Sequence, residues 1–162
     1  RVLGRTARGV RALNLEEDDI VVGMVPVMEN TTVLTVSENG QGRRTDPAEY
    51  RLQSRGGKGI KNYDTQKNGP VAGVLAVGEE DDVILISDDG IIIRIPVAEI
   101  STQSRYAGGV RVMRIGEGSR LVSLCRAPHE DEEEAAAESE APAEAETPAE
   151  ETADSTGTPV EE

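Results

Sequence analysis

Short runs of β-branched and apolar residues alternate with polar turns along most of the chain. The runs Ile20–Val27 and Thr32–Ser37 have the composition and length of strands, and the alternating segment Gly9–Leu15 predicts another strand. The runs Val83–Ile86 and Ile91–Ile95 are apolar nearly throughout, which predicts sheets that are covered on both faces. The pattern therefore predicts an all-β fold.

Turn signals separate these runs. The tripeptides Glu38-Asn39-Gly40 and Asp88-Asp89-Gly90 predict hairpin turns, because glycine after Asn or Asp adopts a positive φ at little cost. The segment Gln41–Thr45 then returns as a further strand. The segment Asp46–Tyr50, with proline near its start, predicts a single helical turn.

The chain matches itself without gaps at an offset of 50 residues. The aligned positions include Arg5 with Arg55 and Arg105, Gly9 with Gly59 and Gly109, Val33 with Val83, Gly40 with Gly90, and Gln53 with Gln103. The repeats cover about residues 3–52, 53–102 and 103–127, and four strands in a unit of this length are typical of propeller blades. We expect β-propeller-like blades in an incomplete ring, and the start at Arg1 within a repeat predicts a fragment of a longer protein.

Acidic residues are concentrated at the C-terminal end. The chain has 31 acidic and 17 basic residues, for a formal net charge of −14. Residues 130–162 hold 14 acidic and no basic residues, which leaves 17 acidic against 17 basic residues in residues 1–129. The strongly negative overall charge therefore does not argue against an anionic partner for residues 1–129, which are neutral overall.

We assign residues 128–162 to a tail of Ala, Glu, Pro, Ser and Thr, which has almost no large apolar residue and is predicted to be disordered. Two roles are open for it. It is either a solubilising appendage or a tethered polyanion that competes with an anionic ligand at high effective concentration.

Little in the sequence indicates catalysis. Cys125, the single cysteine, excludes an internal disulfide and fits a reducing cytoplasm, and its apolar surroundings predict a buried side chain. His129, the single histidine, has no metal-binding partners near it in the sequence and is expected to be structural or idle. Acidic turns such as Glu16–Asp19 are expected to be solvated rather than to bind a metal. No apolar run reaches about 18 residues, so we expect no membrane span.

The segment Gln53–Lys61 combines glycines with cationic side chains. Glycine lets the backbone turn at positive φ and lets a bulky ligand approach the main-chain N–H groups, while Arg55 and Lys58 supply positive charge. This combination suits a phosphate backbone, although a solvated glycine-rich loop is the plainer alternative. A nucleotide phosphate loop is excluded, because Gly59 rather than Ser or Thr follows the lysine.

Further cations are expected to continue a basic rim from repeat to repeat, with scattered surface charge as the alternative. These cations are Arg5, Arg8, Arg11, Arg43, Arg44, Lys61, Arg94, Arg105, Arg111 and Arg114. The chain has no Trp or Phe and three Tyr, which disfavours base stacking, and no helix suited to the major groove is apparent. Contact with duplex phosphates remains, with low sequence specificity and strong salt dependence.

The heptapeptide Gln53–Gly59, within repeats of this length, resembles the wrapping motif Gln-Arg-Arg-Gly-Gly-Lys-Gly of the DNA gyrase A C-terminal domain family. Gly4–Arg11 resembles a second copy of the motif. Gln103–Gly109 resembles a third copy, which has lost the lysine and is expected to keep only the structural part of the role. Ser54 stands where the motif has its second-position arginine. This family forms a β-pinwheel, a propeller-like ring whose blades exchange strands and whose rim wraps DNA.

The resemblance covers residues 1–127 and implies the last blades of such a domain. It implies that the chain binds and bends duplex DNA, so that a type II topoisomerase introduces negative supercoils in an ATP-dependent reaction. The implied partners are duplex DNA, the gyrase B protein and a second gyrase A protein, in a heterotetramer in the bacterial cytoplasm. ATP and Mg²⁺ belong to the whole enzyme, and this segment is expected to hold no cofactor, metal or catalytic residue. The implied DNA-binding residues are Gln53, Arg55, Gly56, Gly57, Lys58, Gly59, Lys61, Arg5, Arg8, Arg11, Arg105 and Arg111.

Three alternatives stay open at this point. The related C-terminal domain of topoisomerase IV has fewer blades and more eroded motifs. A propeller scaffold without nucleic acid would bind proteins on its rim. An incomplete ring is also compatible with a remnant that does not fold unaided.

Overall fold

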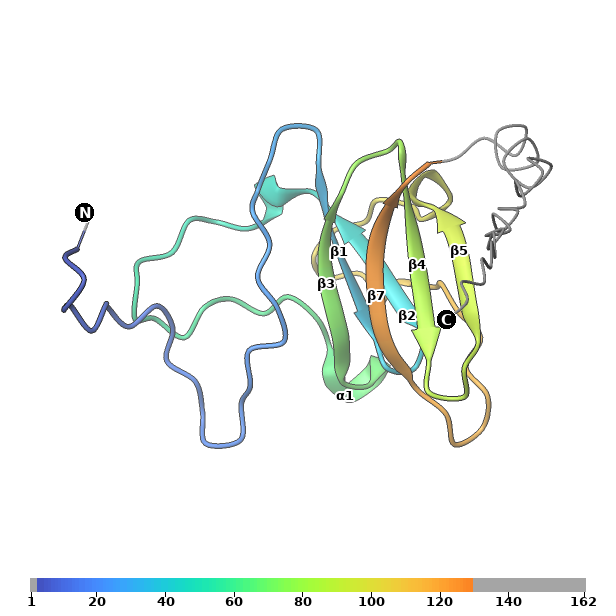
Figure 1. Ribbon diagram of the computed structural model, residues 1–162, viewed down its shortest axis with the longest axis horizontal. Coiled ribbons are helices and arrows are strands. Elements are labelled where there is room, and N and C mark those ends of the chain that lie inside the picture. Colours follow the sequence, from blue (N-terminus) through green and yellow to red (C-terminus); the bar gives the residue numbers. More distant parts are fainter. Residues whose placement is uncertain (1–2, 130–162) are drawn as a thin grey trace, which may run out of the picture. The chain divides into compact units, whose positions relative to one another are not determined.

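The computed structural model describes residues 3–129 and shows an all-β body (Figure 1). Residues 1–129 form one compact unit, and the tail expected from residue 128 lies, from residue 130 on, outside the described residues. The elements in chain order are β1 Thr32–Ser37, β2 Gln41–Thr45, the 3-10 helix η1 Pro47–Glu49, the short helix α1 Thr65–Asn68, β3 Val71–Val77, β4 Asp81–Ser87, β5 Ile92–Pro96, the 3-10 helix η2 Val97–Glu99, β6 Val110–Arg111 and β7 Leu121–Pro128.

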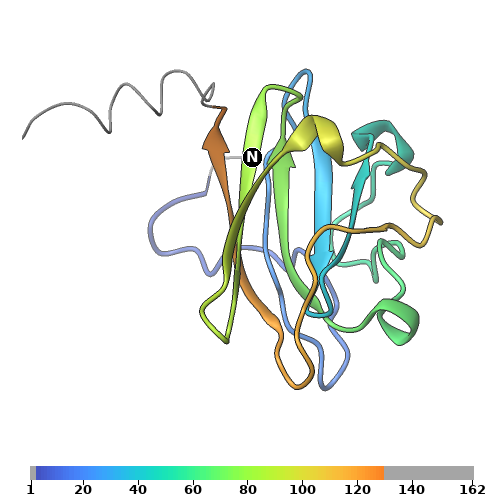
Figure 2. The ribbon, with the colours of Figure 1, turned by 90° about the vertical axis from the view of Figure 1, so that its right-hand side faces the viewer.

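The strands form two antiparallel sheets, which we name blade 1 and blade 2 (Figure 2). Blade 1 has the strand order β3-β1-β2-β6, and blade 2 has the order β5-β4-β7. Each blade joins a hairpin, β1–β2 or β4–β5, to a strand of the following repeat, β3 or β7. The predicted all-β fold with propeller-like, strand-exchanging blades is confirmed.

The pairing register of the strands repeats at the 50-residue offset. Val33 pairs with Ala76 in blade 1 as Val83 pairs with Arg126 in blade 2, and both pairings are interrupted by a bulge at the ends of β1 and β4. The edge of β2 pairs with β6, whereas the matching edge of β5 has no strand beside it among residues 3–129. Ile92 on that edge is 64% exposed.

Local sequence determines the turns and the helix caps. Gly40 and Gly90 end the two predicted hairpin turns with φ of 74° and 85°. The first turn also leaves no room for a side chain, because a Cβ atom on Gly40 would lie 2.3 Å from the Met113 carbonyl oxygen. Asp46 caps η1 by accepting a hydrogen bond from the Ala48 N–H at 2.8 Å.

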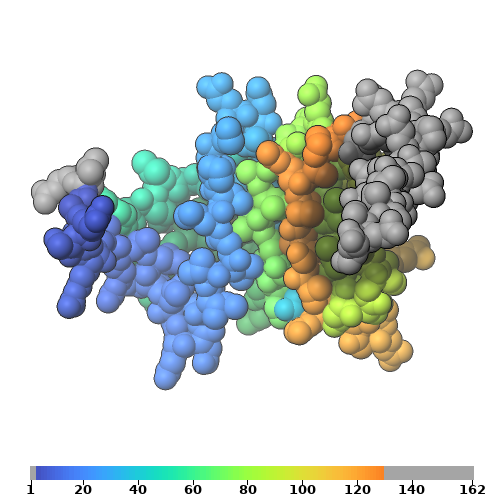
Figure 3. Space-filling model, in the orientation of Figure 1, coloured from blue at the N-terminus to red at the C-terminus, as the bar shows by residue number. Residues whose placement is uncertain are grey.

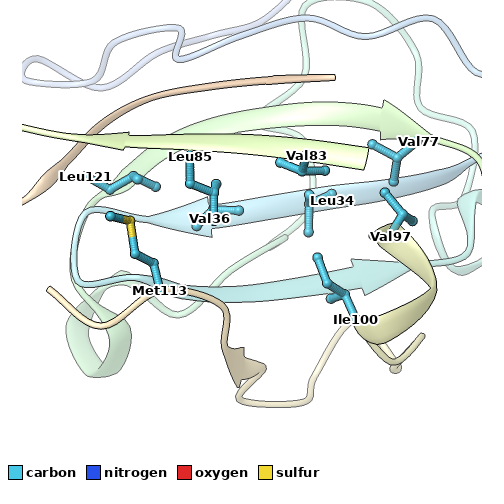
Figure 4. Packing of buried hydrophobic residues seen from close by; sticks show 9 residues of the cluster. All are labelled: Leu34, Val36, Val77, Val83, Leu85, Val97, Ile100, Met113 and Leu121. Atoms are coloured by element: carbon cyan, nitrogen blue, oxygen red, sulfur yellow. The ribbon is translucent and has the colours of Figure 1, made fainter. Parts of the chain in front are cut away.

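The hydrophobic core lies between the two blades (Figure 4). Leu34 and Val36 of β1 face Val83 and Leu85 of β4, and all four side chains are fully buried. The other members of the core are Val77, Val97, Ile100, Met113 and Leu121. Each fully buried side chain of this size contributes about 1.5–3 kcal/mol to stability, so the contact between blades is a main source of cohesion.

The expected strand at Ile20–Val27 is wrong, because this segment is irregular and mostly exposed at the surface of the body (Figure 3). Its 50-residue equivalent is β3, which pairs with the hairpin of the preceding repeat. No hairpin among residues 3–129 pairs with the segment. The prediction of a strand at Gly9–Leu15 is wrong as well. Its strand-like pairing is limited to an isolated parallel β-bridge between Leu13 and Gly57.

Cys125 is exposed, so the expected burial of its side chain is wrong. In β7 it pairs with Ile84, which alternates along β4 with the buried residues Val83 and Leu85. Successive residues of a strand point to opposite faces of the sheet. Cys125 and Ile84 therefore lie on the face of blade 2 that is turned away from the core.

Candidate nucleic-acid interface

Three glycine-rich segments recur at the 50-residue offset, and we name them the first box (residues 3–11), the second box (residues 53–61) and the third box (residues 103–111). The chain just after the first box lies along the second box. The Gly56 N–H donates to the Ala12 carbonyl oxygen at 2.9 Å, and the Asn14 N–H donates to the Gly57 carbonyl oxygen at 2.9 Å. These main-chain bonds fix the second box against the chain that directly follows the first.

The second box is tied in turn to the third. The Arg105 guanidinium donates through Nη1 to the Lys61 carbonyl oxygen, and it stacks over the Tyr106 ring at 4.4 Å from the centroid. The third box is itself docked on blade 1, where Val110 of β6 pairs with Gly42 of β2. The three boxes are thus linked in series, and we call this linked series the box strip.

Glycine is required at one matching position of every box. Gly9, Gly59 and Gly109 have φ of 82°, 77° and 86°, values that residues with a side chain rarely adopt. At Gly109 a Cβ atom would also lie 2.6 Å from the Gly42 carbonyl oxygen. Close docking of the third box on β2 therefore needs glycine.

The cationic side chains expected to bind DNA remain at the surface. Arg105 is half-buried, and the exposed ones are Arg5, Arg8, Arg11, Arg55, Lys58, Lys61 and Arg111. Lys58 lies 3.6 Å from a Glu16 carboxylate oxygen, and Lys61 lies 3.3 Å from Asp64, whose pKa is lowered by this hydrogen bond. Exposed ion pairs contribute only about 0–1 kcal/mol, so both lysines stay available to an anionic ligand.

A groove of about 510 Å³ lies next to the third box and is lined by Gln41 and by residues 109–114. Arg111 and Arg114 line it, and neither has an ion-pair or side-chain hydrogen-bond partner among residues 3–129. Two free guanidinium groups beside a groove suit phosphate oxygens, which they bind through paired N–H donors.

The prediction that Arg43 and Arg44 belong to a basic rim is wrong, because these residues are only 2% and 4% exposed. Both lie on β2, which has β1 on one side and β6 on the other. Arg44 Nη1 lies 3.1 Å from Glu79, an exposed residue. Arg94 is likewise engaged, since its Nε donates to the buried Asp82 carboxylate at 2.7 Å.

Asp82 also binds His129, whose Nδ1 lies 2.7 Å from the second carboxylate oxygen. Burial raises the pKa of the Asp82 carboxyl, but the hydrogen bonds from His129 and Arg94 outweigh burial, and the pKa lies below its usual value. This contact gives His129 a structural role at the end of β7.

The internal role of Arg43 is not apparent from the sequence, because a charged residue in a polar run indicates the surface. The one available signal is its equivalent Ile93, which stands in an apolar strand and marks a position that points into the body.

No group of His, Cys, Asp and Glu within residues 3–129 is arranged to hold a metal ion. No helix in the same part of the chain has the length and apolar character needed to cross a membrane. The arrangement can bind an extended polyanion, because exposed cations recur along a backbone that glycine keeps open to close approach.

The family model described as "DNA gyrase C-terminal domain, beta-propeller" matches residues 1–28, 31–77 and 81–124. The chain is also similar to DNA gyrase A proteins, with 51% identity over 59 residues in Staphylococcus epidermidis and 50% over 58 residues in Helicobacter pylori. Each alignment covers 35% of this chain and 7% of the relative, so the matched region is a small part of those proteins.

Two solved structures resemble the body. One, named as the DNA gyrase A C-terminal domain, has a TM-score of 0.68 and 32% identity, and the match covers 78% of this chain and 43% of that structure. The other, the C-terminal domain of DNA topoisomerase IV, has a TM-score of 0.68 and 23% identity, over 81% of this chain and 42% of the other. The second likeness, at that identity, bears on the fold alone.

Proposed function

The chain belongs to the DNA gyrase C-terminal domain family, and we propose that it binds duplex DNA along its three boxes and bends it. The observation that carries this proposal is the strip itself. Main-chain bonds join the chain just after the first box to the second box, the Arg105 side chain joins the second to the third, and exposed cations occur in all three. A linked row of exposed cations of this kind matches the row of phosphates on a duplex.

The proposed contacts are with phosphates rather than with base edges. No described helix is longer than the four residues of α1, and the three tyrosines offer little surface for stacking. Binding of this kind has low sequence specificity, weakens steeply with salt and favours DNA that bends easily.

We propose further that the chain acts as part of a DNA gyrase A protein in the bacterial cytoplasm. Its partners would be the gyrase B protein and a second gyrase A protein, and bending would let the enzyme, with ATP and Mg²⁺, introduce negative supercoils. We assign no catalytic step to this chain, which matches 7% of the length of its gyrase A relatives. Topoisomerase IV is the second candidate, supported by the likeness of fold, but the 51% identity to gyrase A proteins favours gyrase.

The test is the affinity of the full chain for a duplex of about 40 bp, measured by fluorescence anisotropy between about 50 and 200 mM salt. Phosphate binding predicts a steep linear fall of log affinity with log salt. The double substitution Arg55→Ala/Lys58→Ala should reduce the magnitude of that slope by about 2, because each lost phosphate contact removes about 0.9.

A matched control is Lys67→Ala/Arg126→Ala, which removes two cations outside the boxes. It should leave the slope within experimental error of the parent chain. A slope that responds equally to both pairs would mean that general surface charge, not the box strip, binds DNA. Absence of salt-dependent binding would instead favour a protein-binding role, for which the open edge at Ile91 and Ile92, 48% and 64% exposed, is the available surface.

A further inference from the structure

The two blades fill matching positions with different chemistry. At five positions blade 1 and the chain after the second box carry polar or aromatic side chains, where blade 2 and the chain after the third box carry aliphatic ones or methionine. The pairs are Thr35 and Leu85, Arg43 and Ile93, Thr45 and Ile95, Asn62 and Val112, and Tyr63 and Met113. In the second set, all five residues belong to the hydrophobic core or pack against it. The molecule thus contains its own comparison between a polar and an apolar filling.

Arg43 is the centre of the polar set. Its Nε donates to Thr45 Oγ1 at 3.0 Å, and its guanidinium lies 5.3 Å from the centroid of the Tyr63 ring. Its Nη1 donates to the Ala107 carbonyl oxygen at 2.7 Å, and its Nη2 donates to the Asn62 carbonyl oxygen. Ala107 belongs to the third box, and Asn62 directly follows the second, so one side chain binds the main chain at both boxes.

Asn62 is held from further directions. Its Nδ2 donates to Thr35 Oγ1 at 2.9 Å, and its Oδ1 accepts a hydrogen bond from the Tyr50 hydroxyl. The end of the second box is therefore fastened to β1 and to the turn after η1, besides its bond to Arg43.

Stability alone does not account for this network. A buried charge loses its hydration, and apolar side chains of similar volume give equal or greater stability. Blade 2 forms the same strand register with aliphatic residues at the matching positions. Unlike the apolar set, the polar set binds two carbonyl groups in fixed directions, one in the third box and one directly after the second.

We propose that Arg43 is a positioning residue that holds the second and third boxes at one fixed separation and orientation. A planar guanidinium restricts the directions of the carbonyl groups that accept from it, whereas aliphatic contacts allow sliding. The inference rests on the proposed DNA binding, because a ligand that contacts both boxes benefits from a spacing that is set before it binds.

The spacing can be measured without DNA. Ser54 and Ser104 are equivalent exposed residues in the two boxes, and Cys125→Ser leaves no other cysteine to label. Spin labels at Ser54→Cys and Ser104→Cys on the full chain give a distance distribution by double electron–electron resonance. We expect one narrow distribution in the parent chain and one at least about twofold broader after Arg43→Lys, which keeps the charge but loses the planar fork.

A second variant replaces the five polar or aromatic residues by their equivalents (Thr35→Leu, Arg43→Ile, Thr45→Ile, Asn62→Val and Tyr63→Met) and should broaden the distribution as well. The matched control is Ile93→Val, at the blade 2 equivalent of Arg43, which should leave the width unchanged. Thermal unfolding of each variant identifies those that fold. If the variant with five substitutions does not fold, the distance distribution of Arg43→Lys alone tests the positioning role.

The same variants are then compared on DNA. On a duplex of about 40 bp the salt slope should fall in magnitude by about 2, while affinity for a duplex of about 10 bp, which contacts one box, should be unchanged. An unchanged distance distribution in Arg43→Lys would overturn the positioning role, whatever the DNA result. Failure of the parent chain to bind DNA would instead refute the proposed function, and the distance measurement would still decide the role of Arg43.

Discussion

A single glycine decides whether the third box can dock. Gly109 has a φ of 86°, and a Cβ atom there would lie 2.6 Å from the Gly42 carbonyl oxygen and 3.5 Å from the Cβ of Arg43. In Gly109→Ala the backbone must either keep a strained conformation or lift the third box from β2. We expect the free energy of unfolding in chemical denaturation to fall by about 1–3 kcal/mol.

The adjacent residue provides the control for that prediction. A Cβ atom on Gly108 would meet no atom within 4 Å, and its φ is not positive. Gly108→Ala should therefore leave the free energy of unfolding within about 0.5 kcal/mol of the parent chain. Equal losses in the two variants would show that chain stiffness, and not docking on β2, is what glycine provides here.

The backbone conformation of the box glycines can be predicted from the sequence, whereas the burial of Arg43 and Arg44 cannot. The positive φ of Gly59 and Gly109 can be expected, because glycine recurs at one position of a repeat whose backbone must turn. The burial of Arg43 and Arg44 cannot, because their charge indicates the surface. Their surroundings include residues from later repeats, such as Ala107, and such long-range contacts leave no mark on the local pattern.

Among the elements, strands are predictable where their partners lie in the same sequence. The runs expected at Thr32–Ser37 and Gln41–Thr45 are β1 and β2. Ile20–Val27 has a similar composition and is the equivalent of β3, yet it is irregular, because no hairpin in the described part of the chain pairs with it. Composition favours a strand, but pairing forms it.

The packing of β3 against β7 leads to a second prediction. A Cβ atom on Gly73 of β3 would lie 2.3 Å from Cδ2 of Leu124 on β7. Gly73→Ala should cost about 1–3 kcal/mol through this clash. Leu124→Ala should lower the free energy of unfolding by a similar amount through lost packing. The loss in the double variant should be smaller than the sum of the two single losses, by about 0.5–3 kcal/mol. Chemical denaturation of the four proteins measures this coupling.

A second pair of sites shows whether such coupling is specific. Gly78 contacts Asp81 and Asn30 but not Leu124. The losses in Gly78→Ala and Leu124→Ala are expected to add. If the losses at Gly73 and Leu124 also add, the two strands do not meet as the structure shows.

For the whole molecule, the 50-residue period predicts the blades and the family, because the two blades share one pairing register and the box recurs in each repeat. The period does not predict which surfaces stay open. Cys125 and Ile92 occupy positions equivalent to Leu75 and Gly42, which are covered in blade 1, and they are exposed because nothing in the described part packs beside them. Exposure of a repeat depends on its neighbour as well as on its own sequence.

The division of charge between body and tail leads to the last prediction. Residues 130–162 carry 14 acidic and no basic side chains directly after a body with exposed cations in its boxes. A tethered polyanion competes with DNA at high effective concentration, so removal of these residues should tighten duplex binding about tenfold near 50 mM salt and less near 200 mM, where charges are screened. Anisotropy measures the affinities, and a tail with Gln and Asn in place of Glu and Asp should behave like the deletion. Equal affinities of intact and shortened chains at low salt would leave only the solubilising role.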